Sequence, residues 1–311
     1  MNLSSKIRVG ILRGGTSPAY EESLQTGSYL IKLLNEIPET YEPVDIFVSR
    51  EGVWYHGGIA ISPHEVLEQT DVIWNALHGK EGESGEMARL LEHLERPFVG
   101  SGVVASALAH NKDLTKDVYK LHSLKTPQAH IIHEEFYTEA DLIKAFRELL
   151  HPVVVKPATG VRGLGVKMAR TFQELKEAVK ETFKHSPKVV VEEYISGTIV
   201  TCSVIEGARG EVLYALTPTH LETEHRRVRP RPEENREIER MARLAHEGLG
   251  LRHYSSSDFI VTPRGQIYII ETNSQPLFHP GTMLHDSLSA SGFRPHDFVE
   301  HCLELVLKRK A

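Results

Sequence analysis

Short runs of apolar, β-branched residues alternate with stretches of helical periodicity along most of the chain. In the first third, strands are predicted over residues 6–12, 43–49 and 72–75. A helix is predicted to begin at Pro18, with Ser17 as its N-cap, and to run to about residue 35. This alternation is typical of an α/β fold with a mainly parallel sheet. The Gly100-Ser101-Gly102 segment then marks a boundary.

Two of these strands are followed by residues that could bind a ligand. The first strand ends in Gly14 and Gly15 just before a helix start, where unpaired backbone amides and the helix dipole favour an anion. Alternatively, the two glycines only shape the turn. His78 follows the third strand. Because ligands of such sheets bind beyond the carboxyl ends of the strands, we expect His78 and the two glycines to share a crevice.

The rest of the chain is predicted to contain both helices and strands. The strand over residues 152–157 leads into a glycine-rich segment, residues 160–165. We interpret this segment as a flexible β-hairpin flap over phosphates, because a strand-like stretch follows it and no Gly-Lys-Ser/Thr of a Walker A loop is present. Helices are predicted over residues 103–109, 113–121, 139–149, 171–184, 233–248 and 295–307, and strands over 129–132, 166–168, 199–206 and 211–215, with a further strand from Lys188 leading into a hinge.

The stretch from Asp258 to Asn273 has the most informative pattern. Two apolar runs flank Thr262-Pro263-Arg264-Gly265, which predicts a β-hairpin. A turn centred between residues 264 and 265 places Asp258 opposite Glu271, roughly 5 Å apart, where like charges destabilise the pair. Asn273 shares their face because side chains alternate along a strand. Two carboxylates and an amide oxygen suit Mg²⁺ or Mn²⁺; the alternative is a solvated face whose charges never meet.

Composition narrows the class of protein. The 311 residues are enough for two or three domains, and the net charge of −6 argues against a general binder of nucleic acid or anionic membranes. The 18 histidines are scattered without the Cys/His spacing of a zinc site. Cys202 and Cys302 lie in apolar surroundings, which predicts buried thiols. No signal peptide or membrane span is recognisable, so a cytoplasmic protein is expected.

In order and over essentially the whole chain, these segments resemble the D-alanine–D-alanine ligases of the ATP-grasp superfamily. The resemblance implies an α/β (α+β) ATP-grasp fold with an N-terminal Rossmann-like domain (1–101), a central subdomain (102–188) and a C-terminal subdomain with the metal hairpin (189–311). It also implies that an acyl-phosphate forms from one amino acid and that the amine of a second attacks it. The matching passages are Gly14–Ser17, Asn75–Gly79, Gly82–Gly85, Gly100–Leu108 with Lys112, Val154–Pro157, Glu192–Ile195 and the Asp258/Glu271/Asn273 hairpin.

The resemblance also implies a set of site residues and ligands. Mg²⁺ or Mn²⁺ would bind the hairpin, and ATP would bind between two antiparallel sheets. The substrates would be small and amino-acid-like, without nucleic acid or membrane, and the protein would be a homodimer. The implied residues are Lys156, Arg162 and His78 for catalysis; Lys112, Lys156, Glu192, Ile195 and Gly163 for ATP; Asp258, Glu271 and Asn273 for the metal; and Gly15, His78, Gly281, Ser287 and Leu288 for substrate.

The chain departs from the ligase pattern mainly at substrate positions. Ala19 stands where the ligases carry the Glu that grips the first ammonium, and Ser256 stands where they carry an Arg that stabilises the tetrahedral intermediate. Ile199 replaces a ribose-binding Glu, and an Arg-rich stretch, residues 225–231, replaces a longer closing loop. The ligases carry a glycine directly after Asn-x-x-Pro, and this chain has Leu277 at that position. An insertion would instead make Pro280-Gly281 the equivalent pair.

Three readings follow. The first is an active ATP-dependent carboxylate–amine ligase in which Arg162, or an arginine of residues 226–231, supplies the missing positive charge. Such an arginine could instead bind an acidic or phosphorylated substrate. The second is a Mg-ATP-binding homologue that no longer ligates and has a regulatory or scaffolding role. A Rossmann-type dehydrogenase is disfavoured, because the glycines lack the required strand and helix context.

Overall fold

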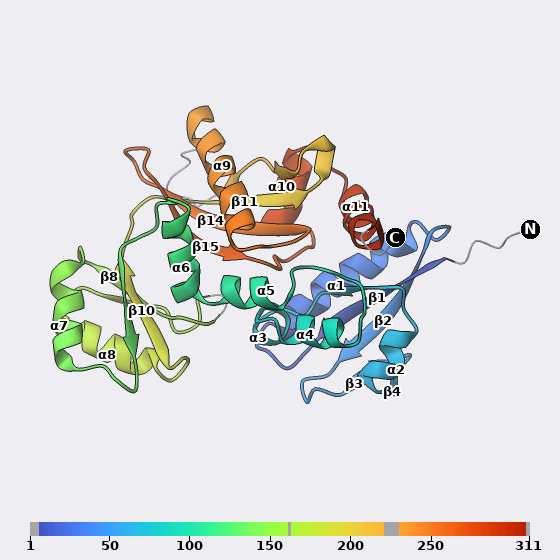
Figure 1. The fold of residues 1–311 in the computed structure, drawn as a ribbon, viewed down its shortest axis with the longest axis horizontal. Helices are drawn as coiled ribbons and strands as arrows, with labels where there is room; N and C mark the ends of the chain where they lie inside the picture. Colours follow the sequence, from blue (N-terminus) through green and yellow to red (C-terminus); the bar gives the residue numbers. More distant parts are fainter. Residues whose placement is uncertain (1–5, 161–162, 221–229, 309–311) are drawn as a thin grey trace, which may run out of the picture.

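The computed structural model describes residues 6–160, 163–220 and 230–308, which form three sheets with helices packed around them (Figure 1). The N-terminal sheet has the order β4-β3-β2-β1-β5-β6, and its central pairs are parallel, as predicted. Its elements are β1 (Ile7–Gly14), α1 (Tyr20–Asn35), β2 (Tyr41–Val48), β3 (Trp54–His56), β4 (Ile59–Ala60), α2 (Pro63–Glu68), β5 (Val72–Asn75), α3 (Lys80–Glu83), α4 (Glu86–His93) and β6 (Phe98–Val99).

The central sheet is antiparallel, with the order β7-β10-β8-β9. α7 and α8 cover the face that points away from the C-terminal sheet, where they bury an aliphatic core with the strands (Figure 1). The elements are β7 (Ala129–His133), α7 (Glu139–Glu148), β8 (Val153–Pro157), β9 (Lys167–Ala169), α8 (Phe172–Thr182) and β10 (Lys188–Glu193).

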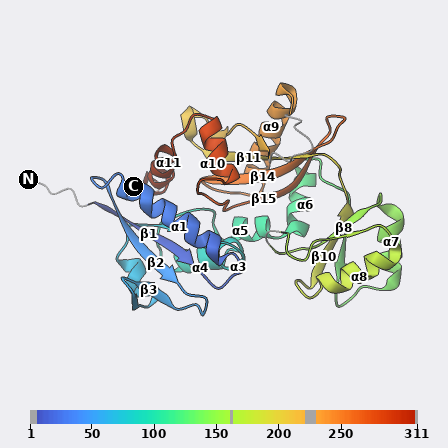
Figure 2. The same ribbon diagram turned by 180° about the vertical axis from the view of Figure 1, so that it is seen from behind.

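The C-terminal sheet is also antiparallel, with the order β12-β11-β14-β15 and β13 paired to β11. Its elements are β11 (Thr198–Glu206), a 3₁₀ turn (Ala208–Gly210), β12 (Leu213–Ala215), β13 (Thr219–His220), α9 (Pro232–Gly248), β14 (Tyr254–Val261), β15 (Ile267–Asn273), α10 (Met283–Ala290) and α11 (Pro295–Lys308). α11 lies beside α1 in both views, and its Phe298 packs edge-on against Trp74 and Tyr254, which joins the first and last parts of the chain in one core (Figures 1 and 2).

The domain limits stay predictions, and the elements on either side of the predicted central part, residues 102–188, pack as follows. Residues 103–121 form α5 (Val103–His110) and α6 (Lys112–Leu121), and α6 packs on α9 and β15 of the C-terminal unit. β10 pairs with β7 and β8, so the central sheet extends to Glu193 and not to residue 188. The thiol prediction is confirmed, since Cys202 and Cys302 are free and buried. Within the described ranges, every helix is too short or too polar to span a membrane.

Candidate active site

The hairpin of β14 and β15 pairs Asp258 with Glu271 and Ser256 with Asn273, as predicted. The pairing of the carboxylates was predicted from a turn centred between residues 264 and 265, and this turn position was wrong. Val261 pairs with Ile267, so the turn is centred on Arg264, half a residue earlier than expected. A β-bulge between Asp258 and Phe259 then adds one residue to β15 and restores the expected pairing at the carboxylates.

The two paired carboxylates suit a divalent cation. Asp258 accepts a 2.6 Å hydrogen bond from the Thr201 hydroxyl. Burial and the neighbouring negative charge of Glu271 raise the pKa of Asp258 to about 7. A cation would remove that repulsion, and carboxylate and amide oxygens are the donors that Mg²⁺ prefers. The described residues contain no group of three or more His, Cys, Asp or Glu side chains suited to a metal, so the set depends on the amide oxygen of Asn273. That oxygen accepts the backbone N–H of Gln275 at 2.8 Å.

A buried ion-pair cluster lies beside the hairpin. Glu192 on β10 is contacted by Lys156 of β8 at 2.5 Å and by Lys116 of α6 at 2.8 Å. The Lys116 ammonium also donates to the Pro127 carbonyl at 2.9 Å and to the Thr126 hydroxyl at 3.0 Å. The two ammonium groups hold the pKa of Glu192 below its usual range although burial opposes this. Two lysine side chains therefore face one carboxylate in a buried site, where burial lowers the pKa of Lys116.

Lys116 was missed by the sequence analysis, although a signal was present. It lies four residues after Lys112 in α6, and residues spaced by four share a helix face. Lys112 opens α6, donates to the Gly160 carbonyl at 2.9 Å and lies 3.7 Å from Glu271. Burial lowers the pKa of Lys112. The same burial leaves its protonated ammonium poorly screened by water, so a polyanion in this position would be strongly attracted to it and would favour the charged form.

A cavity of about 400 Å³ lies between the central and C-terminal sheets, and all five predicted ATP residues line it. Ile199, which replaces the ribose carboxylate, is half exposed at its edge. The Glu192 side chain is held by two lysines. The expected contact of this residue with adenine would therefore be made by its backbone groups. The cavity wall includes Lys112, Lys156, Gly160, Gly163, Leu164, Glu192, Ile195, Ile199, Asp258 and Glu271.

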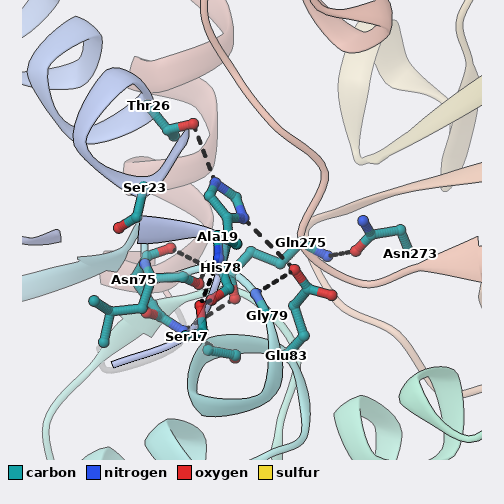
Figure 3. A network of polar contacts seen from close by, with 12 residues as sticks. Ser17, Ala19, Ser23, Thr26, Asn75, His78, Gly79, Glu83, Asn273 and Gln275 are labelled. Atoms are coloured by element: carbon teal, nitrogen blue, oxygen red, sulfur yellow. Dashed lines mark hydrogen bonds and ion pairs between the residues drawn. The ribbon is translucent and has the colours of Figure 1, made fainter. Parts of the chain in front are cut away.

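One glutamine, Gln275, connects the strand ends of the N-terminal sheet to the hairpin (Figure 3). The Gln275 amide donates to the carbonyls of Asn75 and Leu77 at 2.6 and 2.8 Å, and the Asn75 amide donates back at 3.0 Å. His78 is buried beside this contact, with Nε2 3.1 Å from the Thr26 hydroxyl and Nδ1 3.8 Å from Glu83. β15 is thereby fixed against the strand end that carries His78.

The start of α1 differs from the prediction. Ala19, and not Ser17, is the N-cap residue, and no side chain caps the helix. The Ser17 hydroxyl instead donates to the His78 carbonyl at 2.6 Å. The expected anion position at the glycine turn is taken by the chain itself, because the Glu81 carboxylate accepts from the Thr16 amide at 2.8 Å and lies against Gly15. Gly15 and His78 thus lie after neighbouring parallel strands at one edge of the sheet, with Glu81 against the glycine, while the crevice they were expected to share stays a prediction.

A second cavity, of about 190 Å³, adjoins the first through Lys112, Gly160 and Glu271. Glu83 and His110 in its wall were not assigned a role from the sequence, although Glu83 lies only five residues after His78. Leu277 also faces this cavity and narrows it. The wall is formed by His78, Glu83, Ala109, His110, Lys112, Thr115, Gly160, Ile270, Glu271, Thr272, Asn273, Ser274 and Leu277.

The remaining predicted substrate residues lie away from this wall. Gly281 is exposed, Ser287 is buried with its hydroxyl 3.0 Å from that of Thr219, and Leu288 belongs to the hydrophobic core. Ser256 is buried, and its hydroxyl pairs with that of Ser203 at 2.6 Å. The structure therefore places a neutral hydroxyl pair where the resemblance expects an arginine.

Of the predicted compensating arginines, Arg231 is the one that the described residues include. Arg162 and residues 221–229 lie outside the described residues, so their roles stay predictions. Arg231, the described arginine of the 225–231 stretch, lies before α9, where its guanidinium bonds Glu234 at 2.7 Å and packs near Gly265. Arg231 therefore supports the helix start and the hairpin turn.

The chain is similar to known proteins along nearly its whole length. The family model described as "D-ala D-ala ligase C-terminus" matches residues 123–304. A D-alanine--D-alanine ligase of Carboxydothermus hydrogenoformans is 30% identical over 320 residues, covering 97% of this chain and 99% of that protein. Two solved structures share the fold: the D-alanine-D-alanine ligase from Coxiella burnetii (TM-score 0.87, 24% identity, 98% and 94% of the two chains) and the VanG D-Ala:D-Ser ligase from Enterococcus faecalis (0.85, 23%, 97% and 99%).

Proposed function

The chain belongs to the D-alanine–D-alanine ligase family, and we propose that it is an ATP-dependent ligase that joins two small amino acids. The observation that carries this proposal is the convergence of three groups on one pair of adjoining cavities. These groups are the Asp258–Glu271 pair, the Lys112 ammonium and the Lys116–Glu192–Lys156 cluster. Together they provide oxygen ligands for a cation and positive charge for phosphates.

The reaction joins the two cavities. ATP occupies the larger one, with its phosphates toward Lys112 and Lys156. A carboxylate oxygen of the first amino acid attacks the γ-phosphorus, the bond to the β-phosphate oxygen breaks, and ADP leaves. The amine of the second amino acid, after losing a proton, attacks the acyl carbon, and inorganic phosphate leaves as the amide bond forms. Mg²⁺ or Mn²⁺, when held by Asp258, Glu271 and Asn273, supplies charge neutralisation of the phosphate oxygens.

The protein's own groups would act mainly by position and charge. Lys112 is held between Gly160 and Glu271, so its ammonium needs little rearrangement to meet a phosphate. Glu192 fixes Lys156 in the wall of the larger cavity. The hydroxyl pair of Ser203 and Ser256 offers weaker stabilisation to an oxyanion than an arginine would. We therefore expect a slower reaction or a different substrate from that of relatives with arginine there.

A second candidate is a nucleotide-binding protein without ligase activity. It is favoured by the neutral groups at Ala19 and Ser256, while the lysine and carboxylate positions around the larger cavity are retained. The two candidates make the same prediction for ATP binding and opposite predictions for turnover.

Phosphate release separates the candidates. Purified protein is given Mg-ATP with D-alanine, D-serine, glycine and their L- and 2-hydroxy counterparts, singly and in pairs. The ligase proposal predicts release that depends on an amino acid and exceeds the ATP-only rate. ATP binding by calorimetry without substrate-dependent release for any pair would overturn it and leave the second candidate.

A further inference from the structure

The carboxylate of Glu83 is built into the wall of the smaller cavity. Glu83 is the last residue of α3, and its side chain is 13% exposed. The backbone N–H of Gly79 donates to Oε1 at 2.8 Å, which fixes the side chain in place. Figure 3 shows this carboxylate between the Gly79 amide and the imidazole of His78. The carboxylate is therefore both pre-positioned and accessible from the cavity.

Lys112, the lysine in the wall of this cavity, already has partners. Lys112 donates to the Gly160 carbonyl at 2.9 Å and lies 3.7 Å from Glu271. In the described part of the chain, the ion-pair partner of Glu83 is His78, whose Nδ1 is 3.8 Å away. That Nδ1 is buried and has no hydrogen-bond partner there. Within the described residues, Glu83 forms no ion pair with a lysine or arginine, although its charge raises the pKa of Lys112 across the cavity against the larger, opposite effect of burial.

The same cavity also contains the groups expected to act on phosphate. Its wall includes Lys112, Glu271 and Asn273 together with Glu83. A molecule that places its own carboxylate toward Lys112 can therefore place a positive group toward Glu83. The volume of about 190 Å³, with Leu277 in the wall, restricts that molecule to a small one.

Position 19 cannot provide this carboxylate. Ala19 is fully buried and offers only a methyl group, and it adjoins Gly79, since a Cβ built on Gly79 would lie 3.6 Å from the Ala19 Cβ. The Gly79 amide that lies beside Ala19 is the one that holds Glu83. The Glu83 carboxylate, at the end of α3, therefore lies close to position 19.

We propose that Glu83 binds the ammonium group of the amino acid whose carboxylate is phosphorylated. The substrate class is then a small α-amino acid, and 2-hydroxy acids are excluded from the first position because they lack the positive charge. This inference rests on the proposed function, which supplies the phosphorylated carboxylate.

The test compares Glu83→Gln with the wild type on D-alanine and D-lactate, with hydroxylamine trapping the acyl-phosphate as a hydroxamate. Glutamine keeps an oxygen for the Gly79 amide but removes the charge. We expect the preference for D-alanine over D-lactate, measured as the ratio of kcat/KM values, to fall by about 10- to 100-fold. The KM for ATP should stay the same. Glu86→Gln is the matched control, because Glu86 is exposed on α4 outside the cavity wall and should keep the ratio.

Two outcomes would overturn the inference. An equal loss on both substrates would assign Glu83 a structural role and leave the ligase proposal intact. If the wild type yields no hydroxamate with either substrate, the ligase proposal fails for this donor. Calorimetry of D-alanine with Mg²⁺ and a non-hydrolysable ATP analogue then decides: binding weakened by Glu83→Gln supports the inference, and binding unchanged or absent in the wild type overturns it.

Discussion

Replacing Lys116 with methionine tests whether the Lys116–Glu192–Lys156 cluster stabilises the central sheet. Methionine keeps most of the side-chain volume and removes the charge. Glu192 then retains Lys156 alone, while the Pro127 carbonyl and the Thr126 hydroxyl lose their donor. Breaking a buried ion pair costs about 3–5 kcal/mol. Because one lysine remains beside Glu192, we expect about 3 kcal/mol, the lower end of that range.

Native-state hydrogen exchange followed by mass spectrometry is the appropriate assay, because it measures the free energy of opening separately for α6 and β10. A double-mutant cycle with Glu192→Gln isolates the pairwise interaction, which we expect to be about 2 kcal/mol. Lys120→Met is the matched control. Lys120 lies one turn further along α6, is exposed and pairs only with Asp117 at 3.0 Å, so its loss should cost less than about 1 kcal/mol.

A coupling energy below about 0.5 kcal/mol would refute this reasoning, because pairs that interact directly usually exceed that value. A Lys116→Met effect no larger than that of Lys120→Met would refute it as well. In either case the contact between Lys116 and Glu192 would contribute nothing to the free energy of unfolding, although the two groups lie 2.8 Å apart. Lys156 would then need another explanation for its position in the cavity wall.

Three further predictions concern other residues. Asp258→Asn should weaken Mg²⁺ or Mn²⁺ binding, measured by metal-dependent phosphate release, by more than the roughly 10–100-fold that is typical when a residue hydrogen-bonded to a metal ligand is changed; Asp117→Asn is the exposed control. Burial lowers the pKa of His246 to about 4 from 6.5, so the unfolded state binds the extra proton between these values. The free energy of unfolding should therefore fall on acidification from pH 6.5 to 4, by at most about 3 kcal/mol, and urea titrations should show this slope flattened in His246→Gln. Cys202 and Cys302 are buried, and burial raises the pKa of both thiols, so a thiol reagent should label them only after unfolding; rapid labelling of the native protein would contradict their burial.

The metal hairpin shows how much of the site follows from sequence. Alternation of apolar residues and the Pro-Arg-Gly turn predicted the pairing of Asp258 with Glu271. The β-bulge at the carboxylates, which adds one residue to β15 opposite β14, could not be predicted, because strict alternation of side chains along both strands assumes a pairing without extra residues. Two errors of opposite sign in the register therefore cancelled at the residues that matter.

Contacts between distant segments were the least predictable part. Ser17 has the composition of a helix cap, but its hydroxyl is used by the His78 carbonyl 61 residues away. Gln275 joins the N-terminal strand ends to β15, a contact over 200 residues that no local pattern specifies. The placement of Gly15 and His78 at one edge of the sheet was nevertheless predictable, because parallel strands bring their carboxyl ends to the same edge.

The stoichiometry of the reaction with Mg-ATP and pairs of amino acids tests the central claim most directly. ADP, inorganic phosphate and dipeptide are measured together, the last by mass spectrometry, for the wild type and for Asp258→Asn. The ligase account predicts equal amounts of the three products with at least one pair, and none above background with Asp258→Asn. ATP bound at the site with no dipeptide from any pair would contradict it.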